Sequence, residues 1–328
     1  MKSKSDKNLF IITCFASIML FIFSMISPLI FTRSLTDFDF TNTGQIGDTI
    51  GGLMSPFIAM VATILTFAAF YVQYRANQIQ IRNFENQENQ VKLERFETKL
   101  FNMLDIHRKN VSDLEISFKK TETRYFGQNF FPHVINFFNG LYSVFSKYKE
   151  LSEKEKTILS YLYMFYGFSL EMNENLKNHY NSYFDNKIKL GTGLIKYNNA
   201  LIADESIYDY GFGQLLSRYF RYQFQIIKYI DEFEIPGYIM SLEEKKIFRY
   251  EHSKHLRSHL TNNEQILLYY NCLTPLGKIW NDNNYIKDYK LIKNIIIPQV
   301  EGYSPITWAE IDLKLNKDEI KDLFEFIH

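Results

Sequence analysis

Arg249 and His255, an arginine and a histidine with five residues between them, are one candidate arrangement for catalysis in this sequence. Histidine titrates near neutral pH, so beside a cation it suits proton transfer at the 2′-hydroxyl of RNA. His252 and His259 lie close by, which places three histidines within eight residues of a charged helical segment. Such a set also arises by chance on a solvated helix face, so RNA cleavage and a plain surface remain two open interpretations.

Arg257 and Glu264 are the candidate pair to test first, for binding or for catalysis. They lie on either side of Thr261, where one predicted helix ends and the next begins, so both side chains could reach one surface. Each also has a structural explanation. A cation in the last turn of a helix is favoured by the helix dipole. A glutamate three residues after a threonine cap accepts a backbone N–H that otherwise lacks a partner.

A third set of candidate binding residues lies on the helix predicted over 215–231. Arg221 and Lys228 are two turns apart on one face of this helix, with Tyr219 and Tyr222 beside them. These residues either form a solvated edge above aromatic core residues or line a groove. The sequence leaves both interpretations open.

Composition argues against several other classes of site. The 37 basic and 37 acidic residues balance, which argues against a nucleic-acid surface over the whole chain. The only two cysteines, Cys14 and Cys272, lie outside any Cys-x-x-Cys or His-x₃-His cluster, so we expect no disulfide, no zinc and no other cofactor. The glycines of 44–52 are not followed by Lys-Ser/Thr, and no triad order, kinase motif or His-Glu-x-x-His is present.

Two apolar segments determine where all these residues lie. Residues 51–72, GGLMSPFIAMVATILTFAAFYV, carry no charge, and as a helix they would span a hydrocarbon core of roughly 30 Å. Residues 9–31 form a longer apolar run than a signal peptide has, and no small-x-small cleavage site follows, so we expect a retained span. The sequence therefore predicts a transmembrane hairpin with the lipid bilayer as its partner.

The charges around the hairpin predict its orientation. Lys2, Lys4 and Lys7 precede the first segment, Arg75 and Arg82 follow the second, and the loop between the segments is mainly acidic. Basic flanking residues favour the cytoplasmic side. We therefore expect a multi-pass protein of the inner membrane with both termini in the cytoplasm and the loop outside.

Small residues recur every four positions at the start of the second segment, at Gly47, Gly51, Ser55 and Ala59. They predict a smooth ridge on which another helix can approach closely. That helix is either the first segment of the same chain or the same ridge in a second copy, which would make a homo-oligomer. Pro56 either kinks this helix or marks its start.

Helical patterns continue through the rest of the chain. Residues 73–114 contain no proline or glycine, and the sequence predicts a stalk helix there that becomes packed near Val91. The polar stretch 83–90 does not support a long coiled coil. At the end of the stalk we expect His107 and Arg108 on a solvated polar face.

Capping boxes predict three later helix starts, because Ser or Thr is followed three residues on by Glu at Ser152, Ser241 and Thr261. We expect the first of these helices to reach about His179 and residues 121–131 to form a connection. The predicted fold class is mostly α: a transmembrane hairpin (1–72), a stalk helix (73–114) and an all-α cytosolic domain (115–328).

Three stretches together resemble the phage abortive infection family, the AbiC-like membrane proteins of bacterial defence. They are GQIGDTIGGLMSPFIAMVATILTFAAFYVQ at the hairpin, YFR followed by QIIKYID from Tyr219, and LRSHLT followed by Glu264 and LLYYN from Leu256. Asn271 is the last residue of the third stretch, and because of this resemblance we include it among the candidate binding residues. His259 departs from the family, in which we expect an amide residue.

The resemblance implies an anti-phage role with growth arrest or death of the infected cell, started by a phage or host product. It implies no known reaction. We expect the cytosolic domain to sense infection, with damage to the bilayer as one outcome. Two alternatives remain: an RNase similar to the HEPN class, in which Arg249 and His255 act on RNA, and a scaffold without catalysis that recruits another protein. Tyr250 stands where HEPN proteins usually have a polar amide or histidine.

Overall fold

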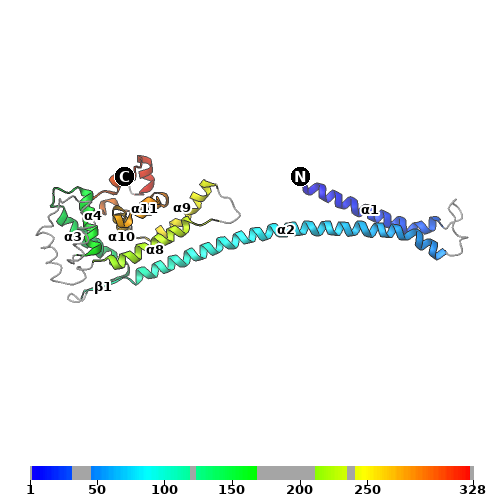
Figure 1. The fold of residues 1–328 in the computed structure, drawn as a ribbon, viewed down its shortest axis with the longest axis horizontal. Helices are drawn as coiled ribbons and strands as arrows, with labels where there is room; N and C mark the ends of the chain where they lie inside the picture. The colour runs from blue at the N-terminus through cyan, green and yellow to red at the C-terminus, as the bar shows by residue number, and fades with distance from the viewer. Residues whose placement is uncertain (1, 32–45, 119–122, 168–210, 235–240, 326–328) are drawn as a thin grey trace. The chain divides into compact units, whose positions relative to one another are not determined.

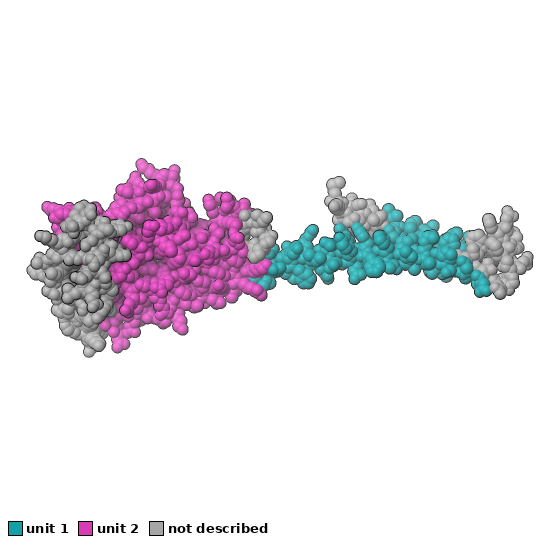
Figure 2. All heavy atoms as spheres, in the orientation of Figure 1, with its two compact units in different colours: residues 1–91 teal, residues 92–328 magenta. Residues whose placement is uncertain are grey.

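The computed structural model describes residues 2–31, 46–118, 123–167, 211–234 and 241–325. The chain divides into two compact units, unit 1 over Met1–Val91 and unit 2 over Lys92–His328 (Figure 2). The division falls inside the predicted stalk segment. The predicted loop 32–45 lies outside the described residues, as do the stretch 168–210 and residues 235–240.

Unit 1 contains helix α1 (Lys2–Phe31) and the first part of helix α2 (Ile46–Ser112) (Figure 1). Pro56 lies inside α2, one of the two alternatives that the sequence left open, and the helix begins ten residues earlier at Ile46. By length and composition, α2 is the one described helix that is long and apolar enough to cross a membrane. In α1 the apolar part, Ile11–Ser27, is shorter.

The side chains of unit 1 are distributed in the opposite way to those of a water-soluble helix pair. Ser17, Ser24 and Ser27 of α1 are buried, with 3%, 1% and 0% of their surface exposed. Large apolar side chains point outward instead, among them Phe15 at 65% and Phe67 at 73% exposed. Soluble proteins bury large apolar residues and expose polar ones. Small and hydroxyl residues at a helix contact, with apolar residues outside, are typical of helices packed in lipid.

The contact between the two helices of unit 1 follows a three-and-four spacing on α2. The least exposed positions there are Met54, Phe57, Val61, Ile64, Ala68 and Tyr71. The ring of Phe57 packs edge-on against that of Phe23 on α1, with 5.2 Å between centroids. The predicted ridge of Gly47, Gly51, Ser55 and Ala59 is not on this face, because all four residues are exposed.

Unit 2 is mostly α, as predicted. Its longer helices are α3 (Phe130–Phe145), α4 (Glu153–Tyr166), α8 (Gly213–Asp231), α9 (Leu242–His259) and α10 (Asn262–Leu273), together with the C-terminal part of α2 (Figure 1). The C-terminal region consists of short helices: η2 (Pro275–Gly277), α11 (Lys278–Asp282), α12 (Tyr285–Tyr289), η3 (Ile297–Gln299), α13 (Pro305–Ile311) and α14 (Lys317–Leu323).

The three predicted capping boxes are confirmed. Ser152, Ser241 and Thr261 each accept a hydrogen bond from the backbone N–H three residues on, and the glutamate there accepts from the cap in return. Each box satisfies backbone groups that have no partner inside the helix. The starts of α4, α9 and α10 are therefore determined by local sequence.

Aromatic rings fill the core of unit 2 between α3, α4, α8 and α10. On α3, Phe130, Phe131, Phe138 and Phe145 are completely buried. Phe138 stacks on Tyr270 of α10 with 4.0 Å between ring centroids. Aromatic pairs in contact add about 0.5–1.5 kcal/mol beyond their buried area. This packing accounts for much of the high phenylalanine and tyrosine content.

Three local expectations are wrong. Residues 123–126 form strand β2 (Thr123–Phe126), paired antiparallel with β1 (Glu115–Phe118), followed by a 3₁₀ turn η1 (Gly127–Asn129), so unit 2 is not entirely α. Helix α4 ends at Tyr166, well short of His179, because Gly167 takes a φ of 79° that a continuing helix does not allow. His107 is buried at 2% exposed, whereas its neighbour Arg108 is exposed as expected.

We predict that Gly302→Ala destabilises unit 2 by roughly 2–4 kcal/mol, because it combines backbone strain with overpacking. Gly302 has a φ of 89°, and an added Cβ would lie 2.3 Å from Thr157 Oγ1 and 2.9 Å from a ring carbon of Tyr142. Urea unfolding of the full chain in a neutral detergent, followed by tryptophan fluorescence, measures the change. Glu310→Ala, at an exposed helical position, is the control. Equal unfolding midpoints for the two variants would contradict the prediction.

Candidate functional site

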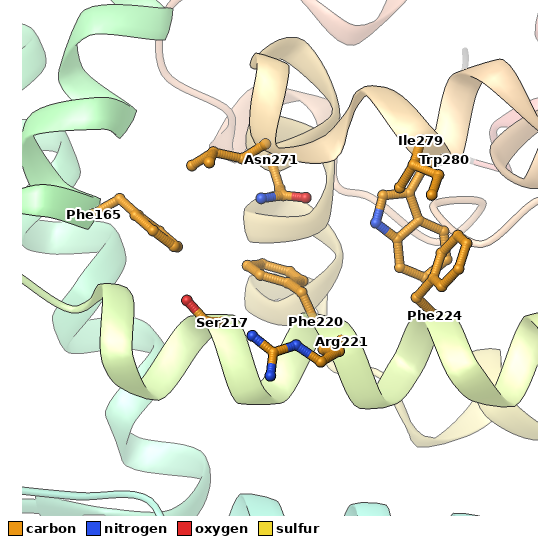
Figure 3. A pocket seen from close by; sticks show the side chains of 9 residues that line it. Phe165, Ser217, Phe220, Arg221, Phe224, Asn271, Ile279 and Trp280 are labelled. Carbon is orange, nitrogen blue, oxygen red and sulfur yellow. The ribbon is translucent and has the colours of Figure 1, made fainter. Parts of the chain in front are cut away.

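A pocket lies between α8 and the α10–α11 region of unit 2, with a volume of about 240 Å³ (Figure 3). Its walls are mostly aromatic and aliphatic, with three polar side chains among them. The lining residues are Phe165, Ser217, Phe220, Arg221, Phe224, Asn271, Leu276, Ile279 and Trp280. All but Phe165 come from α8, α10, η2 or α11.

Arg221 is the one charged residue of the pocket. It is exposed, and it makes no ion pair or hydrogen bond with any other described residue. Figure 3 shows its guanidinium on the α8 side of the pocket, near Ser217. The Ser217 hydroxyl is already engaged, because it donates to the backbone carbonyl of Gly213. A guanidinium stays charged at any physiological pH and offers several donors in one plane. It is therefore free to bind an anionic group.

Asn271 is held in place on the opposite wall. Its Nδ2 donates to the hydroxyl of Tyr161 at 2.9 Å, inside the core. The turn η2 packs directly on it: a Cβ on Gly277 would lie 2.4 Å from both the backbone and the side-chain oxygen of Asn271. Glycine is required at 277 for this close approach, and the shape of the pocket depends on it.

The lining of the pocket has features of a binding site. Its polar side chains are Ser217, Arg221 and Asn271, and no Asp, Glu, His or Cys is among its lining residues. Phe224 and Trp280 meet edge to face, with 5.3 Å between ring centroids, and form a fixed apolar wall. Apolar walls with a few polar groups are typical of small-molecule sites. Among the described residues, no three His, Cys, Asp or Glu are grouped so as to hold a metal ion.

A buried hydrogen bond connects α8 and α10, two of the helices that line the pocket. The hydroxyl of Tyr219 on α8 donates to Glu264 Oε1 on α10 at 2.8 Å, and both residues are at most 2% exposed. Glu264 Oε2 meanwhile completes the capping box with Thr261. Burial raises the pKa of Glu264, although the hydrogen bonds from Thr261, Tyr219 and Gln128 oppose that shift. Glu264 and Tyr219 are thus structural residues of the core rather than part of an open surface.

His107 packs against the same tyrosine from α2. Its ring lies 5.3 Å from that of Tyr219 and 6.3 Å from that of Tyr222. Neither ring nitrogen makes a hydrogen bond to a described residue. Burial, with the nearby His259 as a smaller cause, lowers the pKa of His107 to about 4. The imidazole is therefore neutral at physiological pH.

The other predicted binding residues are separated. Lys228 pairs with Glu232 at 3.5 Å, and its side chain is 44% exposed. Arg257 donates to the backbone carbonyl of Lys290 at 3.3 Å and lies over the ring of Tyr250. Arg257 and Glu264 therefore have different partners. Of the predicted set, the structure brings only Arg221 and Asn271 together at the pocket.

Arg249 and His255 also point to different neighbours. Arg249 pairs with Asp231 at the end of α8, with 3.3 Å between Nη1 and Oδ1, and Asp231 in turn accepts hydrogen bonds from Tyr285 and Tyr289. His255 packs against Phe101 of α2, with 5.3 Å between ring centroids. Within the described chain these two residues do not form an acid–base pair.

Only part of the pocket could be predicted from the sequence. Phe220 and Phe224 are one turn apart on α8, a pattern that indicates core packing as readily as a binding wall. Trp280 and Ile279 come from the short helix α11, for which the sequence offers no strong signal. Phe165 lies on α4, far away in sequence. These residues meet because α10 and α11 fold back over α8.

Comparison with known proteins bears on this same region. Residues 213–300 match the model of the family described as "Putative phage abortive infection protein". The resemblance expected from the sequence is thus confirmed over this part of the chain, which contains eight of the nine pocket residues. No curated protein and no solved structure shows significant similarity to the chain.

We predict that Tyr219→Phe lowers the free energy of unfolding by about 1–3 kcal/mol, because it removes a hydrogen bond from a buried carboxylate. The ring, and so the packing, is kept. Tyr222→Phe is the matched control, since Tyr222 is half-buried on the same helix and its hydroxyl has no hydrogen bond to a described residue. Urea unfolding of the full chain in neutral detergent measures both. A Tyr219→Phe variant as stable as the control would refute a role for this bond.

We predict that His107 makes the free energy of unfolding decrease as the pH falls. Its pKa falls from 6.5 in the unfolded chain to about 4 in the folded one, so between these values the unfolded state binds more protons. Stability is then lost as the pH falls from 6.5 to 4, by about 3 kcal/mol. His107→Phe keeps the ring contacts and should remove this contribution to the pH dependence of the free energy of unfolding. Unfolding free energies measured at pH 7 and pH 4 test it. An unchanged slope would contradict it.

Proposed function

We propose that the chain is a membrane-anchored anti-phage effector of bacteria that causes abortive infection. Its pocket senses an infection product, and the response arrests or kills the host cell. The proposal of a membrane anchor is supported by the arrangement of unit 1, where buried serines form the helix contact and large apolar side chains face outward. The anti-phage role is supported by the family match over residues 213–300.

The anchor is the hairpin of α1 and residues 51–72, with the loop outside and both termini in the cytoplasm. Exposed apolar patches of this extent are not stable in water. Lys2, Lys4 and Lys7 before α1, with Arg75 and Arg82 after residue 72, support this orientation. The exposed small residues from Gly47 to Ala59 leave a face of α2 on which a second copy can pack.

Sensing is assigned to the pocket because Arg221 there is charged and without a partner among the described residues. A small molecule with a planar apolar part and an anionic group fits its walls. Binding would be relayed through residues 73–114, which connect the sensing region to the anchor, and damage to the bilayer would follow. RNA cleavage is disfavoured, since Arg249 and His255 have separate partners.

We predict that Ile58→Arg with Leu65→Arg removes the chain from the membrane and abolishes protection against phage. Both side chains are about half exposed on the apolar face of α2. An arginine near the centre of a span costs roughly 2.5–3.5 kcal/mol on insertion scales. Carbonate extraction of membranes and plaque counts measure the two effects.

The matched control for this pair is Gln80→Arg with Gln87→Arg, at the same seven-residue spacing on exposed, polar positions of the same helix. This control should stay in the membrane fraction and protect fully. Full protection by the Ile58→Arg, Leu65→Arg variant from the soluble fraction would overturn the anchored function.

We predict that Arg221→Ala abolishes protection while the protein remains folded and in the membrane. Arg218→Ala is the matched control. Arg218 is also an exposed arginine of α8, but its Nη2 donates to Asn110 at 2.8 Å and it does not line the pocket. Membrane potential and RNA integrity are followed together in infected cells. Equal protection by the two variants would remove the pocket from the mechanism, and RNA degradation with an intact membrane potential would favour the nuclease.

A further inference from the structure

Four cations gather around one half-buried tyrosine, Tyr250 of α9, away from the pocket. Lys254 Nζ lies 4.9 Å, Lys290 Nζ 5.0 Å and Arg257 Cζ 5.6 Å from the centroid of its ring. The fourth cation, Lys293, lies one turn beyond Lys290 and acts on the Tyr250 hydroxyl electrostatically. We call these five residues the Tyr250 cluster.

The Tyr250 cluster arises from the contact between α9 and the turn after α12. Lys290 has a φ of 50°, and its backbone carbonyl accepts the Arg257 hydrogen bond at 3.3 Å. At this turn the Lys290 ammonium lies over the Tyr250 ring of α9, and Lys293 N–H donates to the Lys290 carbonyl at 3.1 Å. Left-handed backbone at a residue other than glycine is uncommon and frequently found at functional sites.

The positive charge of the Tyr250 cluster is only partly neutralised. Lys254 pairs with Glu251 and Lys290 pairs with Asp322. Arg257 and Lys293 have no carboxylate partner among the described residues. Two positive charges are therefore left over in a half-buried place, where their mutual repulsion is stronger than in bulk water.

The pKa of the Tyr250 hydroxyl is affected by this excess positive charge. Burial of the ring raises the pKa of Tyr250, but a hydrogen bond from Arg257 and the charges of Arg257, Lys290 and Lys293 outweigh that effect and lower it. The surroundings of this oxygen thus favour a negative charge. Lys254 remains 40% exposed, so the cluster is open to solvent.

We propose that the Tyr250 cluster is a binding site for a phosphate monoester group. Such a group carries about −1.5 to −2 charges at pH 7, which matches the two cations left without a carboxylate. Its oxygens accept hydrogen bonds from a guanidinium and from ammonium groups, which are the donors present here. The group belongs to a soluble metabolite or to a lipid headgroup, because both offer the same chemistry.

The test compares ligands that differ in phosphate charge. The full chain, held in nanodiscs of neutral lipid, is titrated calorimetrically with AMP and with cyclic AMP, which keeps the base and sugar but carries a single charge. AMP should bind at least about tenfold more tightly, and its affinity should fall as the pH drops below about 6, where the monoester takes up a proton. Short-chain soluble phosphatidic acid forms the lipid arm. Binding of either monoester supports the proposal and shows whether the phosphate group belongs to a soluble metabolite or to a lipid headgroup.

Variants connect binding to the Tyr250 cluster. Lys293→Gln and Lys254→Gln should each weaken monoester binding by at least about tenfold, since each removes a full charge close to the ligand. Lys278→Gln is the matched control, because Lys278 is an exposed lysine of α11 with its own partner, Asp282. Thermal unfolding of each variant checks that the fold is kept.

Three results would overturn the proposal. They are no binding of AMP or phosphatidic acid, equal affinity for AMP and cyclic AMP, and binding unchanged in both Lys293→Gln and Lys254→Gln. Binding of single-stranded RNA without binding of either monoester would assign the cluster to nucleic acid instead. The anti-phage function proposed above is tested by plaque counts, so the two proposals can fail separately.

Discussion

The arrangement of unit 2 depends on one buried carboxylate. Glu264 is 1% exposed, yet it caps α10 through Thr261 and accepts the hydroxyl of Tyr219 from α8. A charge in this place is costly unless its oxygens are hydrogen-bonded. The hydrogen bonds to Thr261 and Tyr219 therefore determine both where α10 begins and how it lies against α8. Because α8 and α10 both contribute residues to the pocket, its shape depends in part on the same contacts.

A second polar connection fixes the other end of α8. Asp231 accepts from Tyr285 and Tyr289 of α12 and pairs with Arg249 of α9. This group of contacts brings α9 and the region after α12 together, and so it builds the Tyr250 cluster. The Tyr250 cluster and all pocket residues except Phe165 lie in the segment that matches the abortive infection family, but the two sites differ in chemistry. The pocket is aromatic with one free guanidinium, whereas the Tyr250 cluster is strongly cationic.

Unit 1 follows a different physical rule. In water, large apolar side chains are buried because their exposure is unfavourable. Among the described side chains of unit 1, Ser17, Ser24 and Ser27 are buried, and most of the phenylalanine, isoleucine and methionine side chains face outward. This distribution of side chains is unusual for helices in water and typical of helices that pack against each other in lipid. The distribution of side chains in unit 1 therefore says more about its surroundings than the length of the apolar stretch in either helix does.

Sequence alone determined the features that depend on neighbours a few residues away. The capping boxes predicted the starts of α4, α9 and α10, and apolar composition predicted the one described helix that is long and apolar enough to cross a membrane, because both signals are local. Only the tertiary structure decided that His107 is buried, that Arg249 pairs with Asp231 instead of His255, and that Arg221 and Asn271 share a pocket. Those contacts join residues far apart in the chain. The same holds for Tyr250 and Lys290, forty residues apart, which meet because Lys290 adopts a left-handed backbone and α9 packs on α12.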